Sequence, residues 1–68
     1  MNQEESEFPK MLTVKQLARY LEMDENTIYR LAESGKIPGM KVGSEWRFKK
    51  ELVDEWLEEV SLLTFIQF

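Results

Sequence analysis

The chain has 68 residues, which is enough for one compact domain, because a chain this short buries only about 60% of its unfolded surface. It contains no cysteine and no histidine, which excludes disulfide scaffolds, zinc sites built on sulfur or imidazole, and Ser-His or Cys-His nucleophilic catalysis. The composition therefore predicts a protein that is not an enzyme, and one that uses no metal, cofactor or small-molecule substrate.

The formal net charge of −4 argues against indiscriminate binding to nucleic acid, because phosphates attract lysine and arginine. The charge is nevertheless unevenly distributed along the chain. Residues 26–50 contain six basic and two acidic side chains, which gives +4, and the other residues together carry −8. This segregation predicts one basic face on an otherwise acidic protein.

Residues 1–10 are polar and acidic, contain Pro9 and show no periodicity that could bury a face, so we expect a disordered leader. An acidic N-terminus is unlike a secretory signal, which predicts a cytoplasmic protein. The longest apolar run, residues 62–68, is far shorter than the roughly 20 residues of a membrane-spanning helix, so no membrane contact is expected.

Two short helices are expected next. Thr13 and Gln16 have the spacing of a capping box, and the apolar residues that follow predict a helix over Val14–Leu21. Asp24 is a good N-cap for a second helix with apolar residues at helical spacing, which Gly35 ends. Two helices separated by about three residues, the second with a polar outer face, are typical of a helix-turn-helix.

Beyond residue 39 the period changes from helical to alternating, which predicts a β-hairpin around Gly43-Ser44-Glu45. The residues expected to face inward are Met40, Val42, Trp46 and Phe48, and those expected to face outward are Lys41, Arg47 and Lys49. A third helix is expected from Lys50 to Val60. Its outer face is too acidic to lie along DNA, and its inner face is given by Leu52, Val53, Trp56, Leu57 and Val60.

An ordered set of residues between Met11 and Leu57 matches this series of elements. The set consists of Leu12-Thr13-Val14, Ala18, Leu21, Thr27-Ile28-Tyr29-Arg30, Gly35-Lys36-Ile37-Pro38, Val42-Gly43, Trp46-Arg47-Phe48, Leu52 and Glu55-Trp56-Leu57. In this set the chain resembles the excisionase-type DNA-binding domains of the MerR superfamily. The resemblance implies an α+β, mainly helical winged helix-turn-helix over residues 11–60. It also implies a second helix in the DNA major groove and a hairpin wing on the backbone or in the minor groove.

The second helix supplies the first candidate DNA contacts. Because Ile28 faces the core, helical spacing places a polar set on the opposite surface, namely Asn26, Thr27, Tyr29, Arg30 and Glu33. Asparagine can read adenine, arginine can read guanine or hold phosphate, and hydroxyls commonly hold phosphate. The alternative is an ordinary solvated helix face, which the residues favour by themselves; with the resemblance, DNA contact is the better interpretation.

The hairpin supplies Lys41, Arg47 and Lys49 as further candidates. If the aromatic residues beside Arg47 pack inward, Arg47 projects outward on the side shared with Lys41, where it could bind phosphate or a narrow minor groove. The alternative is a surface pair within the hairpin. Lys49 could hold phosphate or pair with nearby carboxylates. Trp46 and Trp56 are expected in the core rather than as base-stacking platforms.

The start of the second helix departs from the family pattern, which usually has a small polar residue followed by a basic one. This chain has Asp24 and Glu25, which stabilise a helix N-terminus but repel a docking phosphate, and Glu45 near the wing tip adds to the repulsion. We therefore expect weak affinity for a single DNA site and a contribution from several copies bound side by side.

Residues 61–68 form an apolar tail with five large apolar side chains in eight residues. The tail could close the core, pair with another copy or lead into a further region. Two functions stay open. One is sequence-specific binding of double-stranded DNA, as an excisionase-like recombination directionality factor or a small transcriptional regulator, with further copies or an integrase-like protein as partners. The other is a protein-interaction module that uses the acidic third helix and the apolar tail.

Overall fold

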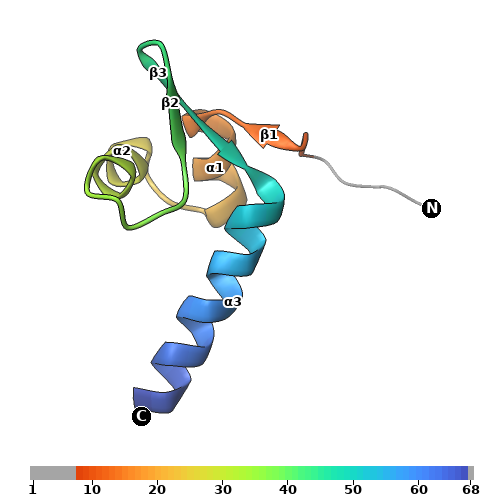
Figure 1. The fold of residues 1–68 in the computed structure, drawn as a ribbon, viewed down its shortest axis with the longest axis vertical. Helices are drawn as coiled ribbons and strands as arrows, with labels where there is room; N and C mark the ends of the chain where they lie inside the picture. Colours follow the sequence, from red (N-terminus) through yellow and green to blue (C-terminus); the bar gives the residue numbers. More distant parts are fainter. Residues whose placement is uncertain (1–7, 68) are drawn as a thin grey trace, which may run out of the picture.

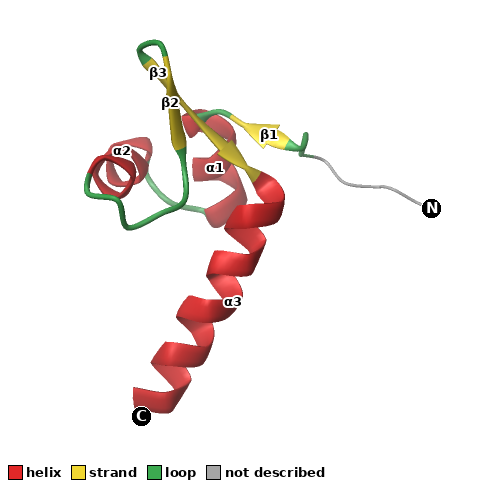
Figure 2. Ribbon diagram, in the orientation of Figure 1, coloured by secondary structure: helices red, strands yellow, loops and turns green. Residues whose placement is uncertain are grey.

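The computed structural model describes residues 8–67, and this part of the chain forms three helices and three short strands (Figure 1). In chain order these are β1 (Met11–Leu12), α1 (Val14–Leu21), α2 (Glu25–Glu33), β2 (Met40–Val42), β3 (Glu45–Lys49) and α3 (Lys50–Gln67). The strands form one antiparallel sheet in which β3 lies between β1 and β2. Figure 2 shows the helices around this small sheet, so the predicted α+β, mainly helical winged helix-turn-helix is confirmed.

One hydrophobic core joins α1, α2, the sheet and the first turns of α3. The largest fully buried side chains are Phe48, Leu12, Leu17, Ile28 and Val53. Burial of such large apolar groups supplies most of the stability of a domain of this size. Since α1 packs against α2, β1 and β3, it is the element that connects α2 to the sheet.

The predicted capping box at the start of α1 is present. The Gln16 N–H donates to Thr13 Oγ1 at 3.1 Å, and the Thr13 N–H donates to Gln16 Oε1 at 2.9 Å. Each side chain thus satisfies a backbone donor that the first turn of a helix leaves without a partner. The bounds of α1 are those predicted from the sequence.

The hairpin loop between β2 and β3 contains two residues, Gly43 and Ser44, rather than the three predicted. Gly43 has φ 66°, the positive value that the first loop position of a type II′ turn requires. A loop that is shorter by one residue shifts the strand pairing by one, and such a shift moves every β2 side chain to the other face of the sheet.

The observed register therefore reverses the predicted faces of β2. The paired residues are Met40 with Arg47, Lys41 with Trp46, and Val42 with Glu45. The expectation that Met40 and Val42 face inward is wrong, because they are 41% and 61% exposed. The expectation that Lys41 shares a side with Arg47 is also wrong. Opposed residues share a face, and Lys41 Nζ lies 5.7 Å from the centroid of the Trp46 ring.

The third helix is longer than the Lys50–Val60 helix predicted, and residues 61–67 continue it as part of α3. This stretch contains neither glycine nor proline, so no residue in it breaks a helix. Val53 is buried at the start of α3, whereas Leu52, which was expected to face inward, is 43% exposed. The distal half of α3 projects away from the body in Figure 1. The radius of gyration of 12.7 Å accordingly exceeds the roughly 11 Å expected of a compact chain of this length.

The last residues of the predicted leader lie against the body of the domain. The Phe8 ring meets the Tyr20 ring edge to face, with 5.0 Å between centroids, and the Lys50 N–H donates to the Lys10 carbonyl at 2.8 Å. The expected disorder of residues 1–7 lies outside the described residues.

Candidate nucleic-acid interface

A tight turn over residues 22–24 sets the direction of α2 relative to α1. Glu22 adopts the left-handed conformation with φ 57° and ψ 50°, and the Met23 N–H donates to the Ala18 carbonyl at 2.9 Å, which satisfies the end of α1. Asp24 is the N-cap residue of α2, as predicted, but its carboxylate makes no capping hydrogen bond. Its negative charge still lies at the N-terminus of α2, where it opposes an approaching phosphate.

The polar residues predicted on α2 do face away from the core. Ile28 is fully buried, Asn26, Tyr29 and Arg30 are exposed, and Thr27 is half-buried beside them. Arg30 Nη2 donates to Thr27 Oγ1 at 3.5 Å, which is at the long limit for a hydrogen bond. The guanidinium is therefore only weakly held by its own helix. This surface presents an amide, a guanidinium and hydroxyl groups, the groups that read base edges and bind phosphates.

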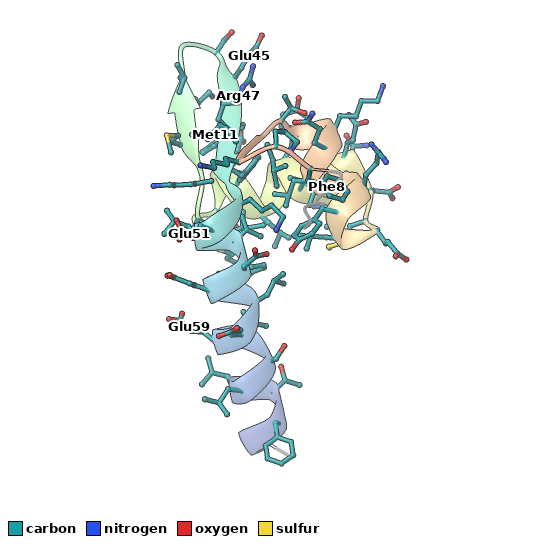
Figure 3. All side chains as sticks on the ribbon, turned by 90° about the vertical axis from the view of Figure 1, so that its right-hand side faces the viewer. Phe8, Met11, Glu45, Arg47, Glu51 and Glu59 are labelled. Atoms are coloured by element: carbon teal, nitrogen blue, oxygen red, sulfur yellow. The ribbon has the colours of Figure 1, made fainter. Side chains whose placement is uncertain are left out.

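The wing arginine has partners on its own strand. Arg47 is half-buried, its Nη2 lies 2.8 Å from Glu45 Oε1, and its Nη1 donates to the Trp46 carbonyl at 2.9 Å. Glu45 and Arg47 are two residues apart and thus share one face of β3, which Figure 3 shows near the wing tip. A phosphate at Arg47 would compete with the Glu45 carboxylate for the same guanidinium.

A depression of about 270 Å³ lies between the wing, the start of α1 and α2. Tyr29 from α2 and Arg47 from the wing both line it, so two of the predicted contacts from different elements meet there. Lys15 of α1 lines the same depression and was not predicted. Its position in the first turn of α1 follows from the sequence, but only the packing of α1 against β3 brings it beside the wing.

The two remaining wing candidates lie elsewhere. Lys41 is on the Trp46 side of the hairpin, away from Arg47. Lys49 is at the opposite end of β3 from the hairpin loop and lines a pocket of about 550 Å³ at the base of the sheet, together with Lys10 and Lys50. Lys41, Arg47 and Lys49 therefore do not converge on one point.

Trp46 and Trp56 are half-buried and pack against the core, which agrees with the interpretation that they are not base-stacking platforms. The Trp46 ring stacks on Phe48 with an interplanar angle of 18° and 6.3 Å between centroids. The indole ring thereby supports the inner side of the wing.

A polar cluster fastens the start of α3 to α1. The Tyr20 hydroxyl donates to Asp54 Oδ1 at 2.5 Å, and Lys50 Nζ lies 3.0 Å from Asp54 Oδ2. Hydrogen bonding to Asp54 raises the pKa of both Tyr20 and Lys50 above their ordinary values. Partial burial raises the pKa of the Asp54 carboxyl, but the hydrogen bonds from Tyr20 and Lys50 outweigh it and leave this pKa below its ordinary value.

Within residues 8–67, no group of acidic side chains is arranged to hold a metal ion. No helix in this part of the chain is both long and apolar enough to cross a membrane.

A helix-turn-helix supported by a hairpin, with a polar second helix open to solvent, defines the class of winged helix-turn-helix proteins. Comparison of the sequence with family models agrees with this geometry. The chain belongs to the family of the helix-turn-helix domain, whose model matches residues 11–61. The family is one of DNA-binding domains rather than of enzymes.

Two relatives come from Mycobacterium tuberculosis, and both carry the provisional name of DNA-binding protein. They are MT0521 of strain CDC 1551 / Oshkosh and Rv0500A of strain ATCC 25618 / H37Rv. Each is 33% identical over 49 residues, which cover 72% of this chain and 63% of the relative. The chain thus spans less than two thirds of the length of these relatives. No solved structure matches the chain. The family and the relatives together support DNA binding.

Proposed function

We propose that the chain binds double-stranded DNA sequence-specifically, with α2 in the major groove and the β2–β3 wing on the backbone or in the minor groove. The observation that carries the proposal is the outer surface of α2, where Asn26 and Arg30 are exposed and only weakly engaged within the chain. An α-helix fits the major groove, where each base pair presents a distinct pattern of donors and acceptors. We also propose that the protein is cytoplasmic, because the DNA of bacteria, from which the two relatives come, lies in the cytoplasm.

The biological role that we propose is that of an excisionase-like recombination directionality factor or a small transcriptional regulator. Affinity for one site is expected to be low, because Asp24 and Glu25 oppose phosphate at the start of α2 and Glu45 pairs with the wing arginine. Several copies on adjacent sites, or an integrase-like partner, would raise the overall affinity without new contacts to DNA.

Selection of bound fragments from random duplex DNA, at two salt concentrations, tests this function. Arg30→Ala is expected to weaken binding of the enriched sequence by about 1–3 kcal/mol and to relax one base position. Arg30→Lys is the matched control, because it keeps the charge and loses the bidentate geometry with which arginine reads guanine. It should retain non-specific affinity and still lose the base preference.

Arg47→Ala is expected to weaken binding of all sequences alike, because a wing arginine on the backbone carries no base information. Thermal unfolding of each variant, monitored by circular dichroism, checks that the fold is retained. The proposed function would be contradicted if the wild-type protein enriched no sequence and if Arg30→Ala and Arg47→Ala bound DNA as well as the wild type does.

The distal half of α3 favours a second candidate function, contact with another protein. Val60, Leu62, Leu63 and Phe65 are 38%, 59%, 59% and 76% exposed, and no part of the chain that the structure describes covers them. Residues 60–67 carry no charge, so two copies of this helix end could pack together without electrostatic repulsion. We therefore propose that a second copy of this chain binds to the exposed apolar side chains at the end of α3.

Sedimentation velocity tests this contact. The wild-type protein should form dimers at micromolar concentration, and Leu63→Glu should leave it monomeric, because a carboxylate in an apolar interface loses its hydration without a partner. Glu55→Gln, a change on the proximal part of the same helix, is the control and should leave the dimer intact. A monomeric wild-type protein would rule out this candidate.

A further inference from the structure

A pocket of about 550 Å³ lies at the base of the sheet, where three segments of the chain meet. Lys10 precedes β1, Lys49 ends β3 and Lys50 begins α3. We call this site the basal lysine pocket; it is lined by Phe8, Lys10, Lys49, Lys50, Glu51 and Asp54. None of its residues lines the depression between α2 and the wing.

The charges in the basal lysine pocket are not balanced. Asp54 is already engaged by Lys50 at 3.0 Å and by the Tyr20 hydroxyl, so this carboxylate is compensated. Within the described part of the chain, Lys10 and Lys49 form no ion pair. Glu51 is then the one carboxylate of the lining left to oppose two ammonium groups. The pocket is therefore a locally positive site in a chain with a net charge of −4.

The pocket also lies at the end of the face of β3 that carries Arg47. Arg47 and Lys49 are two residues apart on β3, so they share the outer face of the sheet, and their Cα atoms lie roughly 6–7 Å apart along the strand. Met11 pairs with Lys49 on this same face. Figure 3 shows Arg47, Met11 and Glu51 in succession along this side of the molecule, from the wing toward α3. Two basic residues, Arg47 and Lys49, thus lie on this face between the wing tip and the base of the sheet.

We propose that the basal lysine pocket binds a phosphodiester group of the DNA backbone, beyond the contact made by the wing. The inference rests on the proposed function and extends the contact with DNA to Lys10, which precedes the wing by about thirty residues in the sequence. Exposed ammonium groups bind phosphate as point charges and release condensed counterions. Glu51 lowers the affinity of the pocket, since it places a carboxylate beside the phosphate.

Fluorescence anisotropy with a short labelled duplex of random sequence, over a range of salt concentrations, tests the pocket. The double variant Lys10→Gln/Lys49→Gln should reduce the slope of log K against log salt by about 0.9 for each phosphate that the variant no longer neutralises. Glu51→Gln should raise affinity by roughly twofold to fivefold at low salt, the effect of one partly screened charge. Glu59→Gln, the same change of charge farther along α3, is the matched control and should have no effect (Figure 3).

The outcomes separate the pocket from the proposed function. If the wild-type protein binds no duplex at low salt, the proposed function fails and the pocket fails with it. If the wild-type protein binds and Arg30→Ala weakens it, but the double variant keeps the wild-type slope, only the pocket is refuted. Equal effects of Glu51→Gln and Glu59→Gln would show that net charge rather than this site matters, and would also refute the pocket.

A second measurement distinguishes DNA from free phosphate as the ligand. Backbone amide shifts of Lys49 and Glu51 are followed by NMR during titration with duplex, and separately with inorganic phosphate at equal ionic strength. Shifts with the duplex support the inference. Shifts with inorganic phosphate alone would overturn it, because the pocket would then bind a small anion and not the DNA backbone.

Discussion

The two faces of β3 differ in what they touch, although their residues alternate along five positions. Trp46 and Phe48 point to the core, where Phe48 is fully buried. Glu45, Arg47 and Lys49 point outward, where Arg47 pairs with Glu45 and donates to the Trp46 carbonyl, and Glu45 and Lys49 are exposed to solvent. The inner face therefore determines stability and the outer face is available for binding. Because the two sets alternate, each can be changed by mutation with little effect on the other.

Among substitutions that test the difference between the two faces of β3, Phe48→Ala is expected to have the largest effect on the free energy of unfolding. Loss of a fully buried aromatic ring should lower the free energy of unfolding by about 3–5 kcal/mol, a large share of the total for a domain of this size. Phe48→Leu should cost less and keep the protein folded for measurement. Urea unfolding followed by tryptophan fluorescence gives the values.

Val42→Ala on the outer face is the control for this comparison. Val42 is 61% exposed, so its truncation should change the free energy of unfolding by no more than about 0.5 kcal/mol. A loss from Val42→Ala comparable with that from Phe48→Leu would show that the outer face is covered in solution.

The inner face of β3 could be predicted from the sequence, but the face of β2 could not. Alternation requires Trp46 and Phe48 to point the same way, whatever their partners are. The pairing of β2 depends on whether Glu45 belongs to the loop or to the strand, and both choices are compatible with Gly43-Ser44-Glu45. One residue of difference moved Lys41 away from Arg47. Local patterns determine a face within one strand, whereas register depends on the turn.

The candidate DNA-binding site likewise has features that could be predicted from the sequence and features that could not. The exposed surface of α2 follows from helical spacing once Ile28 is placed in the core, and the structure agrees with it. The pairing of Arg47 with Glu45 depends on side-chain conformation, which spacing does not determine. Lys10 reaches Lys49 only because β1 pairs with β3, and a two-residue strand has no signal of its own in the sequence.

Gly39→Ala is expected to disturb the packing of Phe48 on the inner face of β3. A Cβ atom at this position would lie 2.6 Å from Phe48 Cε1 and 2.8 Å from Phe48 Cδ1, which is closer than carbon atoms pack. The ring must move, so we expect a loss of about 1–3 kcal/mol in the free energy of unfolding. The same substitution in a Phe48→Leu background should cost less, because the shorter side chain leaves room. Equal costs in the two backgrounds would contradict a clash with the ring.

Asp54→Asn measures how much the partly exposed polar cluster around Asp54 contributes to the free energy of unfolding. We expect this contribution to be smaller than that of the apolar face of β3. The pKa of Asp54 is lowered in the folded protein, so its stabilising effect is complete above the unfolded value of about 3.9 and is lost as the pH falls through the folded value. The side chain is 41% exposed, which limits the effect to less than about 1 kcal/mol.

Urea unfolding of the wild type and Asp54→Asn between about pH 5 and pH 2 measures the contribution of this carboxyl. The difference between the two proteins should shrink toward low pH, because protonation removes the charge to which Tyr20 and Lys50 are hydrogen-bonded. A difference that stays constant with pH would mean that the carboxyl contributes through its shape and not its charge.

Glu45→Gln is expected to have the smallest effect on stability. Because Glu45 lies on the outer face of β3, this substitution also tests how that face contributes to DNA binding. The Arg47–Glu45 pair is a surface contact with side chains 35% and 67% exposed, so its loss should change the free energy of unfolding by less than about 0.5 kcal/mol. The guanidinium then has no carboxylate at its Nη2, and binding to duplex DNA should strengthen by roughly twofold to fivefold at low salt. Anisotropy measurements on Glu45→Gln, with Arg47→Ala and the double variant, test this coupling. The gain should disappear in the Arg47→Ala background, because Glu45 acts on DNA through Arg47; a gain that persists there would mean that Glu45 repels the phosphates directly.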